Sequence, residues 1–283
     1  MRYGTGFGVQ AIFITHLHAD HFLGITGLLR TMGLQGRQDP IALYGPRGSR
    51  PTLRQAVYLG VDRLPFEVSV EELEAGEPVA CPEFDVVPFA VNHGTPALGY
   101  ALREHFRLGR FDVDRARELG VPEGPLFGKL HRGESVEVDG RFVDPAEVVG
   151  PSRPGRIVLY SGDTRPSGST VEAGRGADLL IHEATFGEEE SDRAHETFHT
   201  TASGAAQVAR DAGTTRLILT HISARYSEDP SALQEEARRI FPRTQVGHDG
   251  MTIELAYQKG PEGEDPMGSQ GTAQASGGGS ENG

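Results

Sequence analysis

The amino-acid sequence predicts a layered α/β fold, and two observations support this prediction. Short segments rich in β-branched and aromatic residues alternate along the chain with segments in which apolar residues recur at helical spacing. The chain has 283 residues, of which 37% are hydrophobic, so one large domain can bury a full core. Strands and helices that alternate this regularly are typical of helices layered on sheets.

The expected strands are short apolar runs bounded by turn-forming residues. Residues Ala11–Thr15 come first, and this run is apolar, β-branched and too short for a helix. The other strands are expected at Ile41–Tyr44, Phe84–Val91, Arg156–Tyr160, Asp178–Ile181, Arg216–Thr220 and Thr252–Leu255.

The expected helices lie between these strands. Residues Ser231–Ile240 give the clearest start signal, because the segment follows Asp229-Pro230 and carries Gln234 and Glu235 in its next turn. The other helices are expected at Phe22–Met32, Gly48–Leu59, Asp114–Leu119 and Thr201–Ala212.

Two regions break the alternation of strands and helices. Residues 103–152 are dense in charge and lack a clear apolar period, so we expect an insertion that projects from the body formed by the rest of residues 1–257. Residues 258–283 are rich in Gly, Ser, Glu and Gln with almost no apolar residue. We expect this tail to be disordered, because it cannot bury enough apolar surface to offset the entropy of ordering.

A dense group of metal-ligating residue types follows the first expected strand. The segment His16-Leu17-His18-Ala19-Asp20-His21 places four such side chains within six residues. A strand end followed by a tight loop lets these side chains converge from alternate directions. Imidazole nitrogens and a carboxylate oxygen suit Zn²⁺ or a similar divalent ion.

Three later segments place one more ligand type directly after an apolar strand. His93 follows Phe84–Val91, Asp163 follows the strand that ends at Tyr160, and His221 follows the strand that ends at Thr220. We expect these side chains to emerge at a common sheet edge beside the first group. The single cysteine excludes a cysteine-rich zinc site and an internal disulfide framework, so the ligands must be His, Asp and Glu.

These motifs together resemble those of a known family. His-x-His-x-Asp-His, a lone His, Ser-Gly-Asp-Thr and a further lone His resemble the metallo-β-lactamase superfamily. Additional segments resemble the ribonuclease Z family within it, and the resemblance runs from the first residues to about Leu255. They are Tyr3-Gly4-Thr5-Gly6-Phe7, Asn92-His93-Gly94, His182-Glu183-Ala184-Thr185-Phe186, His199-Thr200-Thr201 and Ser223-Ala224-Arg225-Tyr226.

The resemblance implies an αββα sandwich, with two mixed sheets flanked by helices, and a site for two Zn²⁺ ions per subunit of a homodimer. His16, His18 and His93 would hold one zinc; His21, His221 and Asp20 would hold the other; Asp163 would bridge them. Members of the family normally carry further strands and a phosphate-loop segment before the Tyr3–Phe7 stretch. We therefore expect the sandwich of this chain to be N-terminally incomplete.

The activity implied by the resemblance is removal of the 3′ trailer from precursor tRNA. Asp20 is the candidate to orient or deprotonate the attacking water. His199 is the candidate acid for the leaving ribose oxygen, with Glu183 orienting it. The alternative for Glu183 is a buried pair or helix cap, and for His199 a position at a helix start.

Candidate substrate-binding residues lie in two places. Arg225 could bind a phosphate, although an ordinary surface salt bridge is the alternative. In the inserted region, Gly124, Pro125 and Lys129 lie in a segment that resembles the family's tRNA-binding arm. Residues 103–141 carry eight Arg or Lys and eight Asp or Glu, so the insertion is neutral, and a solvated surface insertion is the alternative.

Charge and hydropathy constrain the partners. The net charge of −13 opposes a nucleic-acid partner on average, but a local basic patch or a metal centre can reverse this. No apolar run is long enough for a membrane span and no signal peptide is recognisable, so we expect a cytoplasmic protein. Two alternatives stay open: another superfamily hydrolase acting on a small phosphodiester, thioester or lactone, and a non-catalytic RNA-binding or scaffolding member.

Overall fold

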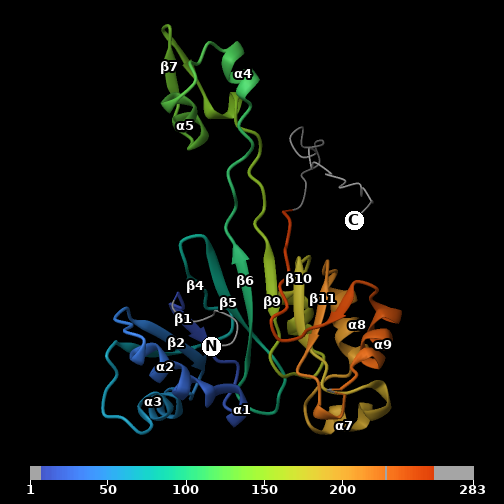
Figure 1. Cartoon of the computed structure of the whole chain (residues 1–283). Helices are drawn as coiled ribbons and strands as arrows, with labels where there is room; N and C mark the ends of the chain where they lie inside the picture. The colour runs from blue at the N-terminus through green and yellow to red at the C-terminus, as the bar shows by residue number, and fades with distance from the viewer. Residues whose placement is uncertain (1–7, 227, 258–283) are drawn as a thin grey trace, which may run out of the picture.

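A computed structural model of the chain describes residues 8–226 and 228–257, and within them two sheets form the body of the molecule (Figure 1). The first is a parallel three-stranded sheet with the order β1-β2-β3, and the second is a mixed seven-stranded sheet with the order β12-β11-β10-β9-β6-β5-β4. The strands of the first sheet are β1 (Ala11–Phe13), β2 (Ile41–Pro46) and β3 (Val68–Leu73). Those of the second are β4 (Val79–Ala80), β5 (Phe84–Ala90), β6 (Leu98–Glu104), β9 (Ile157–Tyr160), β10 (Leu179–Glu183), β11 (Leu217–Thr220) and β12 (Thr244–Val246).

Helices cover the outer face of each sheet, as Figure 1 shows. The first sheet is covered by α1 (Ala19–Phe22), α2 (Gly24–Leu34) and α3 (Arg50–Tyr58), which share one buried apolar cluster with β2. The second is covered by α6 (Gly168–Ala173), α8 (Ala202–Ala212) and α9 (Ser231–Ile240), which pack through small alanines and leucines onto β9, β10 and β11.

A third apolar cluster lies between the two sheets. It joins Leu73 of β3 to Val86 and Tyr100 of β5 and β6, with Phe13 and Tyr44 packed against it. The hydroxyl of Tyr100 donates to the carbonyl of Ile14 at 2.7 Å, which satisfies the polar end of a buried ring. Helix, sheet, sheet and helix therefore form four layers, as the family resemblance implies.

The strand directions place the ends of β5, β9, β10 and β11 and the inserted region at opposite edges of the second sheet. Strands β9, β10 and β11 are parallel, and β5 runs in the same direction as β9 because both are antiparallel to β6. Their carboxyl ends therefore share one edge. The chain between β6 and β9 leaves from the other edge, and in Figure 1 it extends far beyond the body.

This projecting arm consists of a stalk and a head. We define the stalk as residues 105–111 and 149–156, two extended segments joined by β-bridges at Arg107–Arg153 and Phe111–Val149. A side chain at Gly109 would meet the carbonyl oxygen of Gly150 at 1.8 Å, so only glycine lets the two segments approach here. We define the head as residues 112–148, with α4 (Val113–Glu118), α5 (Pro125–His131), β7 (Val136–Val138), β8 (Arg141–Val143) and the 3-10 helix η1 (Pro145–Glu147).

The head has a hydrophobic core of its own, which sequence reasoning did not find. Six buried residues form it, with Leu130 fully inaccessible at its centre. The head's elements have three to seven residues each, too few for an apolar period to show. The core residues are Ala116, Val121, Leu130, Val136, Val143 and Val148.

The strand expected at Thr252–Leu255 is wrong: residues 251–257 form no strand. The position beside β11 is taken by β12, so no pairing partner remains there for the alternating Thr-Ile-Glu-Leu run. The other expected strands and helices are present with shifted ends, and the helix expected at Phe22–Met32 is divided at Leu23 into α1 and α2. Sequence reasoning missed β3 and β6, whose glutamates and Gly99 break the alternation.

The predicted tail at 258–283 and the Tyr3–Phe7 stretch lie outside the described residues. In the described part of the chain, every helix is too short or too polar to cross a lipid bilayer.

Candidate metal centre

One carboxylate oxygen lies at the centre of the predicted ligands. The Oδ2 atom of Asp163 is 3.2 Å from Nε2 of His21, 3.3 Å from Nε2 of His221, 3.8 Å from Nε2 of His16 and 3.9 Å from Nε2 of His93. Asp163 is only 2% exposed. Burial therefore raises the pKa of Asp163 to about 7, because little water is present to solvate its charge.

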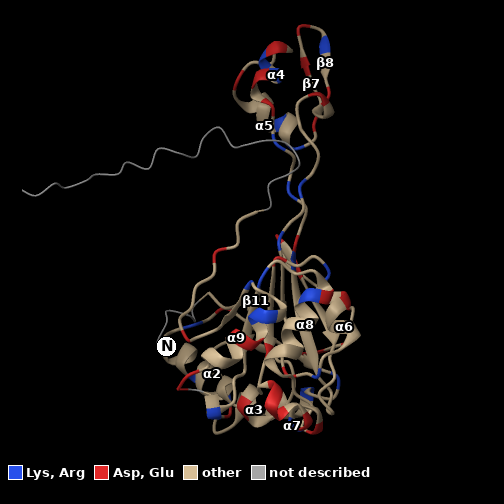
Figure 2. Ribbon diagram, turned by 90° about the vertical axis from the view of Figure 1, so that its right-hand side faces the viewer, with Lys and Arg blue, Asp and Glu red and all other residues tan. Residues whose placement is uncertain are grey.

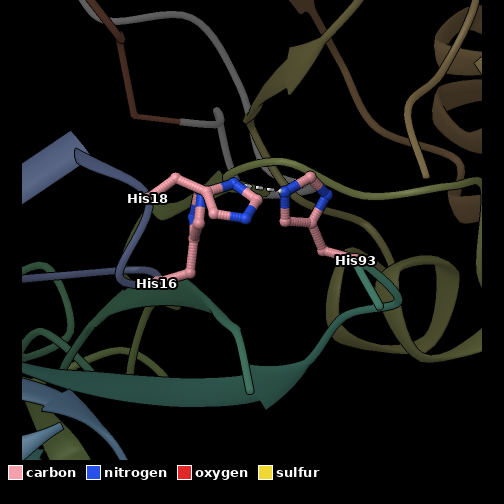
Figure 3. Close-up of side chains that lie close together, drawn as sticks. All are labelled: His16, His18 and His93. Carbon is pink, nitrogen blue, oxygen red and sulfur yellow. Dashed lines mark hydrogen bonds between the residues drawn. The ribbon is translucent and has the colours of Figure 1, made fainter. Parts of the chain in front are cut away.

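His16, His18 and His93 form the first ligand group (Figure 3). The first two follow β1, the third follows β5, and their rings turn toward one another. Nδ1 of His18 lies 3.1 Å from Nε2 of His93. Among the described residues, the buried Nε2 of His16 has no hydrogen-bond partner. An orphaned nitrogen beside a buried carboxylate is what a cation site would leave in a structure without ligands.

Asp20, His21 and His221 form the second group. Asp20 is on α1 with its side chain 75% exposed, and its Oδ2 lies 3.4 Å from Nε2 of His21. His221 ends β11 with a left-handed backbone, φ 54°, which a non-glycine residue adopts only when its surroundings impose it. This conformation turns the His221 ring toward Asp163.

Most of these imidazoles are held through Nδ1, which leaves Nε2 to face Asp163. Nδ1 of His93 donates to the carbonyl of Phe198 at 3.0 Å. Nδ1 of His16 is 3.1 Å from the hydroxyl of Thr15, and Nδ1 of His221 is 2.8 Å from the hydroxyl of Thr185. Such contacts fix the tautomer of a metal-binding histidine.

The histidines are also poised as neutral ligands. Burial, together with the neighbouring imidazoles His21, His93 and His18, lowers the pKa of His16 to about 3. Burial likewise lowers the pKa of His21, His93 and His221. Neutral imidazoles around a buried carboxylate are a donor set that fits divalent ions of the zinc type.

His199 and Glu183 form a hydrogen-bonded pair beside the two groups. Nδ1 of His199 donates to Oε1 of Glu183 at 2.9 Å. Glu183 is fully buried at the end of β10, and its carboxylate also accepts from the backbone N–H of Thr164 at 2.7 Å and of Thr200 at 3.0 Å. The carboxylate is thereby held in one orientation.

Pairing raises the pKa of His199 and lowers the pKa of Glu183. Burial by itself raises the pKa of Glu183, but the hydrogen bonds from His199, Thr200 and Thr164 outweigh burial and leave it lowered. Burial by itself lowers the pKa of His199, but the Glu183 carboxylate outweighs this and raises it. The pair therefore favours a protonated imidazole beside an ionised carboxylate.

Thr185 is a contributor to the site that sequence reasoning missed. Its hydroxyl donates to Oε2 of Glu183 at 2.7 Å and lies 2.8 Å from Nδ1 of His221 and 3.3 Å from Nδ1 of His199. Because the hydroxyl proton goes to the Glu183 carboxylate, Nδ1 of His221 must donate to the Thr185 oxygen, while Nδ1 of His199 gives its proton to Glu183. The signal in the sequence was a hydroxyl residue two positions after Glu183, next to the expected strand end.

The predicted substrate-binding residues are not part of this cluster. Arg225, on the 3-10 helix η3 (Ala224–Tyr226), forms a salt bridge with Glu190. Gly124 and Pro125 begin α5 in the head, and Lys129 lies further along that helix.

The remaining histidines lie outside the ligand groups found among the described residues. His182 is fully buried, and its Nδ1 donates to the carbonyl of Glu183 at 2.7 Å. His105 pairs with Asp85, and His131 donates to the carbonyl of Gly109. His195 and His248 stand apart from the cluster as well.

Comparisons with known proteins agree with this fold. The chain matches the beta-lactamase superfamily domain over residues 5–109 and 147–222, so the match omits most of the arm. It is 53% identical over 259 residues to ribonuclease Z of Gemmatimonas aurantiaca, covering 90% of this chain and 82% of that protein. It is also 53% identical over 257 residues to ribonuclease Z of Myxococcus xanthus, covering 90% and 84%.

A solved structure gives the same result. The short form of human tRNase Z has a TM-score of 0.58 and 26% identity, over 87% of this chain and 79% of that one. The domain match covers more than half of the chain, and the two bacterial relatives are 53% identical to it. The chain belongs to the ribonuclease Z family of the metallo-β-lactamase superfamily.

Proposed function

We propose that this protein is a zinc-dependent endoribonuclease that removes the 3′ trailer from precursor tRNA and leaves a 3′-hydroxyl on the tRNA. The observation that carries the proposal is the convergence of two imidazole groups on one buried carboxylate, with a separate His–Glu pair beside them, in a chain of the ribonuclease Z family. The imidazole groups and the carboxylate can activate water, and the His–Glu pair can supply a proton.

We assign two Zn²⁺ ions to the site. His16, His18 and His93 would hold one ion, Asp20, His21 and His221 would hold the other, and Asp163 would contact both. When bound, such ions lower the pKa of water and neutralise charge that develops on the phosphate. The lowered pKa values of His16, His21, His93 and His221 support the assignment, because only neutral imidazoles can bind a cation.

Asp20 orients the attacking water in this proposal. Its side chain is 75% exposed at the mouth of the cluster, so substrate and water can reach it. The nearby His21 and His221 help to outweigh its small burial penalty and leave the pKa of Asp20 lowered. The carboxylate is therefore ionised at neutral pH and can accept a hydrogen bond, and then a proton, from water.

His199 donates a proton to the 3′ oxygen as that oxygen leaves the phosphorus. Glu183 keeps His199 in its protonated form and fixes its ring by the 2.9 Å hydrogen bond to Nδ1. The Nε2 proton is then available to the leaving group. Different residues therefore act on the two sides of the phosphodiester: Asp20 acts on the attacking water, and His199 acts on the leaving oxygen.

Two further features belong to the proposal. The projecting arm contacts the tRNA at a distance from the bond that is cut, and the protein acts as a homodimer. Large apolar side chains on the first helical layer support a partner surface, because Leu34 is 90% and Leu59 62% exposed. Light scattering of the purified protein measures the number of chains directly.

The test is cleavage of a precursor tRNA with a 3′ trailer, with and without a chelator, followed by mapping of the new ends. We expect one cut at the trailer junction, a tRNA with a 3′-hydroxyl, a trailer with a 5′-phosphate, and no cut after chelation. A tRNA without a trailer is the control. Hydrolysis of a chromogenic phosphodiester without any cut in the precursor would favour the alternative, a hydrolase of small phosphodiesters, thioesters or lactones.

A further inference from the structure

The base of the stalk contains a pocket that neither the metal centre nor the head uses. Its volume is about 770 Å³, and it lies where β6 and β9 pass into the arm. Arginines from both stalk segments line it, together with an aromatic residue from each side of the opening. These are Arg107, Arg153, Arg156, Phe106 and Tyr257.

Arg107 has one unsatisfied donor, although its charge also acts on the nearby Glu104 and helps to lower the pKa of that carboxyl. Its guanidinium lies over the ring of Tyr257, 3.2 Å from the centroid. Its Nε is buried and has no hydrogen-bond partner in the described part of the chain. An unsatisfied buried donor of a charged group is costly, so this position is explained best if a ligand supplies the acceptor.

Arg153 faces the same pocket from the second stalk segment. Its guanidinium donates to the carbonyl of Leu108 at 3.3 Å, a neutral acceptor that leaves the positive charge in place. Arg156 differs, because it forms a salt bridge with Glu104 and donates to the carbonyl of Leu255. Glu104 therefore pairs directly with Arg156 and acts on Arg107 through its charge. Counting Glu83 at the rim, the pocket lining holds three arginines against two glutamates, which leaves it net positive.

The charge of the stalk contrasts with that of the head above it and the body below it. Residues 105–111 and 149–156 carry four arginines and no Asp or Glu. Residues 112–148 of the head carry nine Asp or Glu and five Arg or Lys. In Figure 2 basic residues mark the stalk, whereas acidic residues are prominent in the head. On a protein of net charge −13, the stalk is a local basic zone.

We propose that this pocket is an RNA-contact site, in which Arg107 and Arg153 bind backbone phosphates of the precursor. The proposal rests on the function proposed above. A guanidinium presents a planar fork of N–H donors that matches two phosphate oxygens, and the unsatisfied Nε of Arg107 lies on such an edge. Phe106 is 75% exposed beside these donors and offers a face on which an unpaired base can stack.

The site is remote from the chemistry. Arg156 precedes β9 and Asp163 follows it at the opposite edge of the sheet, so the four residues of the strand alone separate the two by roughly 13 Å. A phosphate bound at the stalk base is therefore not the one that is cut. The pocket contributes to affinity for the precursor and leaves the rate of the bound complex unchanged.

The test compares R107A/R153A with the unaltered protein on precursor tRNA and on bis(p-nitrophenyl) phosphate. We expect KM for the precursor to rise about tenfold, with kcat and hydrolysis of the small diester within about twofold. The slope of log affinity against log salt should fall by about one for each arginine removed. R107K/R153K keeps the positive charge but loses the planar fork of N–H donors. Its affinity for the precursor should lie between that of R107A/R153A and that of the unaltered protein. R175A in the body, whose charge is paired with Glu172, is the matched control and should leave affinity unchanged.

RNA binding measured by fluorescence anisotropy with chelator present separates this proposal from the proposed function. Binding that weakens in R107A/R153A supports the pocket even if no precursor is cut. Affinity and salt slope equal to those of the unaltered protein, with normal diester hydrolysis, would overturn it. The competing occupant of the pocket is the acidic stretch of this chain that follows Tyr257. E262Q/E264Q/D265N removes its charges and tests this alternative. If only that variant changes RNA affinity, the pocket proposal is wrong.

Discussion

The candidate metal centre and the arm differ in how far the sequence predicts the residues that they bring together. At the metal centre, four imidazole nitrogens lie within 4 Å of one oxygen of Asp163, and every ligand expected from the sequence is present in the cluster. In the arm, the expected contacts Gly124, Pro125 and Lys129 lie in a head that carries more acids than bases. Chemistry that depends on residue type can be predicted from a motif, whereas binding depends on the charges that folding brings together.

The largest expected effect is loss of the central carboxylate. We expect D163N to lose at least about 10³-fold in activity on both precursor tRNA and a small phosphodiester, and to retain less zinc, because its one oxygen faces both ligand groups. Metal analysis of the purified protein and steady-state rates measure this. D85N, at an exposed pair with His105, is the control. Full zinc content in D163N would contradict the assignment of Asp163.

The metal-free chain should not be destabilised by D163N. Burial raises the pKa of Asp163 to about 7, above its value in the unfolded chain. The ionised carboxylate therefore opposes folding as the pH rises toward 7, and asparagine removes that cost. Thermal unfolding in chelator distinguishes this loss of metal from a loss of fold.

A somewhat smaller effect is expected from removing the proton donor. We expect H199A to lower turnover of precursor tRNA by about 10²–10⁴-fold while zinc content stays intact, because His199 acts on the leaving group. The loss should be smaller on a diester with an acidic leaving group, which needs no proton. H195A is the matched control, since that side chain stands outside the ligand groups. Unchanged turnover in H199A would exclude this role.

The sequence predicted the cluster of candidate ligands because its residues follow strand ends. The parallel direction of β9, β10 and β11 brings Asp163, Glu183 and His221 to one edge. The strand assignment was enough to expect Asp163 and His221 there, whereas Glu183 was expected only from the family resemblance. The role of Thr185 was missed, because a threonine that orients a histidine looks like any strand threonine. Its function follows from the 2.7 Å contact with Glu183, which no spacing rule supplies.

The sequence indicated where an insertion lies, but it revealed neither the core of the head nor the uneven charge along the arm. Its charge density distinguished residues 103–152 from the body. Its core escaped notice because Leu130 and its neighbours come from elements too short for a period. The basic zone was hidden as well, since the neutral total over 103–141 averages an acidic head with a basic stalk segment.

Destabilising the head should distinguish the role of the arm from that of the metal centre. We expect L130A to cost about 3 kcal/mol of local stability, because Leu130 is fully buried in a core of only six residues. Hydrogen exchange in residues 112–148 should rise while exchange in β9–β11 stays unchanged. Cleavage of precursor tRNA should weaken, and hydrolysis of a small phosphodiester should not. Equal losses on both substrates would show that the head and the metal centre are not independent.

The smallest expected effect concerns the junction between stalk and body. Glu104 and Arg156 form a partly buried salt bridge, with side chains 20% and 31% exposed, and the hydrogen bonds from Arg156 lower the pKa of Glu104. A lowered folded pKa gives stability that is present above the unfolded pKa and is lost as the pH falls through the folded value. We therefore expect E104Q to cost about 1–2 kcal/mol at pH 7 and progressively less as the pH falls from about 5 to about 2.

Thermal unfolding of E104Q and the unaltered protein across this pH range measures the difference. E172Q, which breaks the fully solvated pair with Arg175, should change stability by less than about 0.5 kcal/mol at any pH. Small-diester hydrolysis should be normal in both variants, because the pair lies at the sheet edge opposite the metal centre. A loss in E104Q that does not vary with pH would mean that packing at the stalk base, and not the ion pair, holds the arm to the body.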